Sequence, residues 1–103
     1  MRLADHEAET IRQAVGALFG SDSEVWLFGS RVDDTKRGGD IDLLVVLSSS
    51  RPDEDAAAIW NSRIRLLERL ERQLGERKID VVMAKADDSR PIVAIARSTG
   101  VRL

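Results

Sequence analysis

Two long stretches of the chain place apolar residues at the three- to four-residue spacing of an amphipathic helix. In residues 3–19 the apolar positions share one predicted face and are Ala4, Ala8, Ile11, Val15, Leu18 and Phe19. The second stretch starts from a capping box and a first-turn proline within residues 50–53 and runs to about Leu74. Its predicted buried stripe consists of Ala56, Ile59, Trp60, Ile64, Leu67, Leu70 and Leu74. A glycine follows each stretch, Gly20 and Gly75, where a helix C-cap is expected.

Three shorter apolar segments, residues 24–28, 40–47 and 78–83, predict β-strands. In the middle segment the odd-numbered residues face one way and the even-numbered residues face the other. Both of these faces are apolar after Asp42. We therefore expect a central strand that is covered on one side by helices.

The rest of the pattern consists of shorter elements. Residues 31–36 predict a short helical turn, and residues 37–39 predict a flexible loop. A last helix is expected over residues 91–97, with Gly100 as its stop. The whole order predicts a small α/β (α+β) fold, with a mixed sheet of three to four strands packed on helices, in one domain over residues 1–103.

The composition excludes several classes of protein. Of the 103 residues, 43% are hydrophobic and 33% are charged, which is typical of a globular domain. Cysteine is absent from the sequence, which excludes disulfides and thiolate metal sites. The formal net charge of −2 counts against stable nucleic-acid binding, because phosphate neutralisation supplies most of that affinity. No apolar run approaches the length of a membrane span and no leader pattern is visible, so we expect a soluble, cytoplasmic protein.

Two acids, Asp40 and Asp42, stand one residue apart at the start of the middle strand. Alternate strand residues point to the same face, so their carboxylates are expected to be neighbours. Two carboxylates held this close repel each other unless a cation lies between them. Mg²⁺ suits such hard oxygen ligands and completes its shell with water and substrate phosphates. The pair therefore predicts a Mg²⁺ site.

Gly29 and Ser30 follow the first strand and open the predicted helical turn. Glycine lets a backbone approach a phosphate closely, and N–H groups at a helix start attract anions. An anion cradle beside a cation site is what triphosphate binding requires. Arg31, Lys36 and Arg37 flank this cradle, and two interpretations of them stay open: they neutralise triphosphate charge, or they belong to a solvated loop.

A third acid, Asp80, stands inside the last predicted strand. A charge in an apolar strand is costly to bury unless it is paired or binds a metal. If this strand lies beside the one that carries Asp40 and Asp42, the three carboxylates converge. Two metal ions about 3.5–4 Å apart could then be held. The alternative is an edge-strand charge or an ion pair with Lys78.

Four spaced elements agree with one family pattern: Gly29-Ser30, the loop after it, Gly39-Asp40-Ile41-Asp42, and the distant Asp80. Together they resemble the nucleotidyltransferase superfamily that includes DNA polymerase beta. More narrowly, the chain is similar to the minimal nucleotidyltransferases (MNT proteins) of prokaryotes over almost its whole length. The resemblance implies a nucleotidyltransferase core.

The resemblance also assigns roles to residues. It implies three catalytic metal ligands for Mg²⁺, with two ions expected, and these are Asp40, Asp42 and Asp80. The residues expected to bind the triphosphate of ATP are Gly29, Ser30, Arg31 and Gly39. Many members have a serine where this chain has Gly39, so one phosphate-binding hydroxyl is missing.

A partner protein follows from the same resemblance. Family members of this size are often encoded beside a HEPN protein, with the MNT chain as antitoxin and the HEPN ribonuclease as toxin. The implied enzyme is a protein adenylyltransferase that transfers AMP from ATP to a tyrosine of the HEPN protein and silences it. Two alternatives stay open: a non-catalytic antitoxin that acts by binding, and nucleotidyl transfer to a small molecule. The apolar stripes of the two long helices also predict a partner or self-association.

Several other residues are interpreted as structural. His6 is expected at the surface, and Trp26 and Trp60 are expected in the core rather than as base-stacking platforms. The charged residues of the second helix are expected to form a solvent face with i, i+3 and i, i+4 pairs, and they are Arg63, Arg65, Glu68, Arg69, Glu71 and Arg72.

Overall fold

The computed structural model describes four parts of the chain: residues 3–29, 41–47, 56–75 and 78–103. Three predicted features lie outside these described residues. They are the helical turn at 31–36, the loop at 37–39 and the capping box at 50–53.

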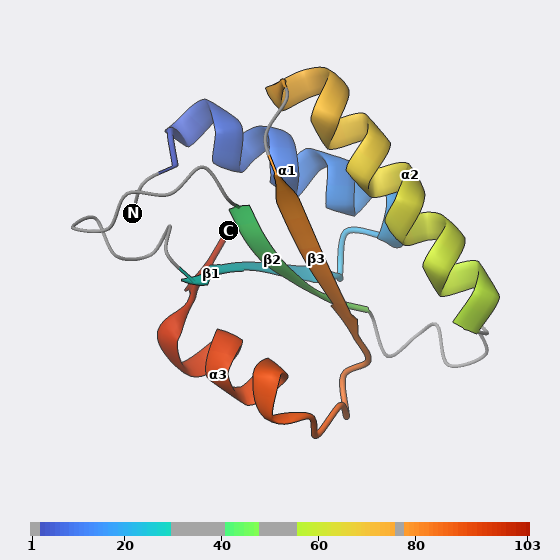
Figure 1. The fold of residues 1–103 in the computed structure, drawn as a ribbon, viewed down its shortest axis with the longest axis vertical. Helices are drawn as coiled ribbons and strands as arrows, with labels where there is room; N and C mark the ends of the chain where they lie inside the picture. Colours follow the sequence, from blue (N-terminus) through green and yellow to red (C-terminus); the bar gives the residue numbers. More distant parts are fainter. Residues whose placement is uncertain (1–2, 30–40, 48–55, 76–77) are drawn as a thin grey trace.

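Three helices and four strands follow one another along the described residues (Figure 1). In chain order they are α1 (Asp5–Phe19), β1 (Glu24–Phe28), β2 (Ile41–Val46), α2 (Ala56–Leu74), β3 (Ile79–Ala84), α3 (Pro91–Thr99) and β4 (Val101–Arg102). The helices and the three longer strands agree with the predicted elements, so the α/β prediction is confirmed. β4 is not predictable from the sequence, because two residues are too short to show an alternating pattern.

The four strands form one mixed sheet in the order β3-β2-β1-β4. β1 runs antiparallel to both β2 and β4, whereas β2 and β3 are parallel. Parallel neighbours need a crossover connection, and α2 supplies it between β2 and β3. The predicted mixed sheet of three to four strands is therefore confirmed.

Helices cover both faces of this sheet (Figure 1). The odd-numbered residues of β2 are buried in the larger core, which the sheet forms with α1 and α2. Leu44 and Val46 point the other way, into a second core that includes Val93 and Ala96 of α3. Helices were expected on one side of this central strand, whereas the structure has α3 on the other side as well. Both faces of β2 are apolar beyond Asp42, and each face needs its own cover.

The predicted glycine caps are confirmed at the two long helices. The N–H of Gly20 donates to the carbonyl of Gly16 at 2.9 Å, and the N–H of Gly75 donates to the carbonyl of Glu71 at 3.0 Å. Both bonds satisfy carbonyl groups that would otherwise lack a partner at a helix end. Among the described residues, none of the helices combines the length and the apolar character that a membrane span requires.

The buried stripe of α2 differs from the prediction. Leu66 and Leu70 are fully buried, and Ile59, Leu67 and Leu74 pack against the same core; Trp60 and Ile64 are 58% and 38% exposed. Each helical residue is rotated by about 100° from the last, which turns these two side chains away from the buried line. The prediction of Trp60 as a core residue is therefore wrong. Trp26 is half-buried and packs against the second core.

Candidate functional site

Two of the predicted acids lie side by side in the sheet. Asp42 is the second residue of β2 and Asp80 is the second residue of β3, and the parallel register pairs them directly. Neighbouring strands are about 4.8 Å apart, and paired residues point to the same face. The residues before them, Ile41 and Ile79, pack into the core formed with α1 and α2. Both carboxylates are therefore directed to the opposite face, the one that α3 covers.

Gly29 lies beside the same pair on the other flank of β2. β1 ends at Phe28, which is the register partner of Asp42, and Gly29 follows directly. Gly29 has a φ of 77°, a left-handed conformation that favours glycine. A Cβ added at this position would collide with the carboxylate of Asp42. The backbone of Gly29 thus approaches the Asp42 carboxylate more closely than any other residue type would allow.

The two acids differ in exposure. Asp42 is half-buried, whereas Asp80 is exposed to solvent near the start of β3. Asp80 is therefore not the buried charge that the sequence suggested, because it lies at the beginning of its strand. The condition for convergence is met, since β3 does lie next to β2. The result is one solvent-accessible and one partly shielded carboxylate on the same face.

The other predicted site residues lie outside the described residues, and they are Ser30, Arg31, Lys36, Arg37, Gly39 and Asp40. Within the described residues, no group of three or more histidine, cysteine and acidic side chains is arranged to hold a metal. The described part of the site therefore supplies two carboxylates and one glycine backbone. Asp40, the remaining acid of the predicted set, directly precedes β2 in the sequence.

The donor set fits a divalent cation. Asp42 and Asp80 are hard oxygen ligands on one face, the kind that Mg²⁺ prefers. The Asp42 carboxylate occupies the place that a side chain at position 29 would take, so glycine is what allows the end of β1 to lie against this ligand. The described residues thus supply carboxylate ligands for a metal, with a glycine backbone directly beside them.

The end of α3 forms one border of this corner of the sheet. A Cβ added at Gly100 would lie 2.7 Å from the carbonyl oxygen of Leu27 and 3.3 Å from the Cβ of Phe28. The helix end is therefore packed directly on β1, one to two residues before Gly29. From the sequence, Gly100 is expected only as a helix stop. Its second role depends on a contact with a strand more than 70 positions earlier, which no local pattern contains.

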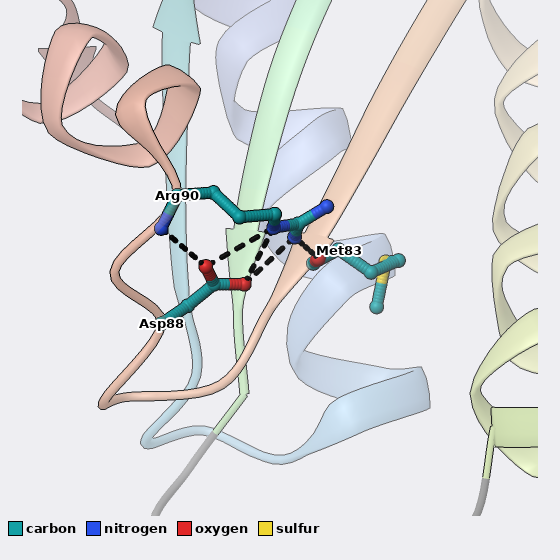
Figure 2. A network of polar contacts seen from close by, with 3 residues as sticks. All are labelled: Met83, Asp88 and Arg90. Atoms are coloured by element: carbon teal, nitrogen blue, oxygen red, sulfur yellow. Dashed lines mark hydrogen bonds and ion pairs between the residues drawn. The ribbon is translucent and has the colours of Figure 1, made fainter.

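A different polar cluster lies at the far end of β3 (Figure 2). The Nε of Arg90 donates to both carboxylate oxygens of Asp88, at 3.0 and 2.9 Å, and its backbone N–H donates to Oδ1 at 2.9 Å. These hydrogen bonds lower the pKa of Asp88 and raise the pKa of Arg90. Arg90 also donates to the carbonyl of Met83 at 2.5 Å. This cluster joins β3 to α3 and is separate from the candidate site.

Comparison with known proteins bears on most of the chain. Residues 8–98 match the model of a family described as "Nucleotidyltransferase domain". The matched range contains Gly29, Asp42 and Asp80. No curated protein matches the chain significantly.

Proposed function

Because the chain belongs to the nucleotidyltransferase domain family, we propose that it is a Mg²⁺-dependent enzyme that transfers AMP from ATP to a hydroxyl of a partner protein. Family membership assigns general nucleotidyl transfer. The observation that carries the more specific proposal is the pairing of Asp42 with Asp80 beside the close backbone approach of Gly29.

The geometry supports the proposed roles of Asp42, Asp80 and Gly29, and the family resemblance supports those of Asp40 and Ser30. Asp42 and Asp80, together with Asp40, would hold the metal through their carboxylate oxygens. Once bound, Mg²⁺ would supply Lewis-acid stabilisation of the charge on the triphosphate and on the attacking and leaving oxygens. The backbone N–H groups at Gly29 and Ser30 would hold phosphate oxygens.

The proposed reaction is an in-line displacement at the α-phosphorus of ATP. The hydroxyl oxygen of the acceptor forms a bond to the α-phosphorus, and the bond from that phosphorus to the bridging α–β oxygen breaks. Pyrophosphate leaves with the electron pair of the broken bond. Asp80 is suited to accept the hydroxyl proton, because its carboxylate is exposed at the sheet end where an acceptor can approach.

The exposure of Asp80 supports a large acceptor. A hydroxyl carried on the surface of another protein can reach an exposed carboxylate, whereas it could not enter an enclosed pocket. The sequence contains no tyrosine, so the chain cannot modify itself on that residue type. We propose a tyrosine of a HEPN toxin as the acceptor and antitoxin action as the biological role.

The test is intact-mass spectrometry of the product of the neighbouring gene, after incubation with the chain, ATP and Mg²⁺. A mass gain of one or more AMP units is expected with the wild type and with Asp87→Asn, which changes an exposed acid in the turn after β3. No gain is expected with Asp42→Asn. Absence of any gain, while the two proteins still form a complex, would overturn the proposal of enzymatic transfer.

A non-catalytic antitoxin is the second candidate. The observation that favours it is the exposure of large apolar side chains on two helices, namely Trp60 and Ile64 on α2 and Ile92 and Ile95 on α3. Such side chains can bury against a partner without chemistry. An Asp40→Asn/Asp42→Asn variant that still neutralises the toxin would support this candidate, and a folded variant that fails to neutralise would support catalysis.

A further inference from the structure

β3 stands at the end of the sheet order, so one of its edges has no neighbouring strand among the described elements. The carbonyls of Lys78 and Ala84 accept hydrogen bonds from the N–H groups of Ile41 and Leu47, which lie on the β2 side. Backbone direction alternates along a strand. The carbonyls of the odd-numbered residues of β3, those of Val81 and Met83 among them, therefore point outward.

The sequence of this edge strand favours pairing with another strand. The segment Ile79–Ala84 contains five apolar residues and one charged residue, and three of the apolar residues are β-branched. Short apolar segments with high strand propensity and little charge readily add to one another. An edge of this kind is a template for a further strand unless something blocks it.

Arg63 of α2 donates a hydrogen bond to one of these outward carbonyls. Its Nε donates to the carbonyl of Val81 at 2.9 Å. The guanidinium carbon also lies 5.2 Å from the centre of the Trp60 ring, a cation–π distance. The exposed Trp60 side chain therefore lies against the arginine at the strand edge.

Arg90 occupies the next outward carbonyl from the other face of the sheet. It donates to Met83 at 2.5 Å while Asp88 holds its guanidinium (Figure 2). α2 covers one face of the sheet and α3, which Arg90 precedes, covers the other (Figure 1). The two arginines therefore approach the same edge from opposite sides and fill consecutive outward acceptors.

We propose that the β3 edge is a pairing surface for a second copy of the same strand, and that Arg63 and Arg90 keep it closed. Two copies would pair antiparallel about a two-fold axis near Val81, which places Ile79 opposite Met83 of the other copy. That arrangement needs the carbonyl acceptors that the arginines occupy. Since β3 also carries Asp80, closing the edge keeps a second copy away from the candidate site. The inference does not depend on the proposed chemistry.

The test measures self-association of the Arg63→Ala/Arg90→Ala variant by sedimentation velocity over a concentration series. Its dimer dissociation constant is expected to be lower than that of the wild type by about tenfold or more. The matched control is Arg65→Ala/Arg72→Ala, which removes the same charge from two exposed positions of α2 and should behave as the wild type. Equal self-association of the two double variants would overturn the proposal.

A third variant identifies the surface used. Adding Ile79→Pro to the Arg63→Ala/Arg90→Ala background removes an N–H at the first position of β3, where proline is tolerated. It should restore the wild-type dissociation constant; continued association would overturn pairing through β3.

Circular dichroism checks that each variant is folded. If the double variant unfolds, the single variants Arg63→Ala and Arg90→Ala take its place, and failure of both to associate more than Arg65→Ala would contradict the proposal.

Discussion

The two ends of β3 hold carboxylates in opposite electrostatic settings. At its start, Asp80 lies beside Asp42, so two like charges share one face. After its end, Asp88 is held by the guanidinium of Arg90, which also binds the carbonyl of Met83. A carboxylate with an arginine is a complete structural unit without any ligand. Two neighbouring carboxylates repel each other, and they are stabilised when a cation binds between them. The first end is therefore the one suited to bind a metal.

The largest effect is expected from Asp42→Asn, which removes one of the two like charges. Nucleotidyl transfer should fall by about 10²–10⁴-fold, measured as the initial rate of AMP incorporation. The midpoint of thermal unfolding without metal is measured as a check that the variant is folded. The matched change at the other end, Asp87→Asn, should leave both the rate and the midpoint as in the wild type. A fully active Asp42→Asn enzyme would contradict the assignment of the metal site to the end of β3 that holds Asp80 beside Asp42.

The second-largest effect is expected from the addition of Mg²⁺ with ATP. A ligand that binds only the folded state stabilises it by about 2.7 kcal/mol when its concentration is 100 times its dissociation constant. Thermal unfolding of the wild type should shift upward accordingly, and unfolding of Asp42→Asn should not. The Arg90→Ala variant should keep the full shift, because its change lies at the opposite end of β3. A shift lost in Arg90→Ala and kept in Asp42→Asn would reverse the assignment of the metal site.

Gly29→Ala should act on both structure and activity. A residue other than glycine at a φ of 77° costs about 1–3 kcal/mol, and the added methyl group would also displace the Asp42 carboxylate. Chemical denaturation should show this loss of stability together with a lower transfer rate. Gly16→Ala is the matched control, since a Cβ there meets nothing within 4 Å and the helix should gain about 0.5–1 kcal/mol. Equal stability of the two variants would contradict the proposed close approach at Gly29.

Local patterns were sufficient to predict most of the fold. Helical and alternating periodicity located α1, β1, β2, α2, β3 and α3, because each buries a periodic set of side chains. The exposure of Trp60 was not predictable from that periodicity, since Arg63 takes the inward position to reach the β3 edge. The cover on the second face of β2 was also missed, although the apolar residues on both faces of that strand indicate it.

The site was predictable in residue type but not in arrangement. The spacing of Gly29, Asp42 and Asp80 indicated the chemistry, whereas their adjacency depends on the order of three strands and on a parallel register. One shift of that register would move Asp80 to the other face of the sheet. The exposure of Asp80 likewise depends on where β3 begins relative to its neighbour, which is a tertiary property.

The smallest expected effect concerns the acid titration of Asp88, which follows the end of β3 remote from the candidate site. Hydrogen bonds from Arg90 lower the pKa of Asp88, so the ion pair stabilises the folded state above the ordinary pKa of an aspartate. That contribution is lost as the pH falls through the lowered pKa, which confines the effect to the range below about pH 4. Carboxyl resonances followed by NMR should show the Asp88 midpoint rising in the Arg90→Ala variant. An identical midpoint in the two proteins would show that Arg90 does not hold this carboxylate, and with it the contrast between the two ends of β3 would fail.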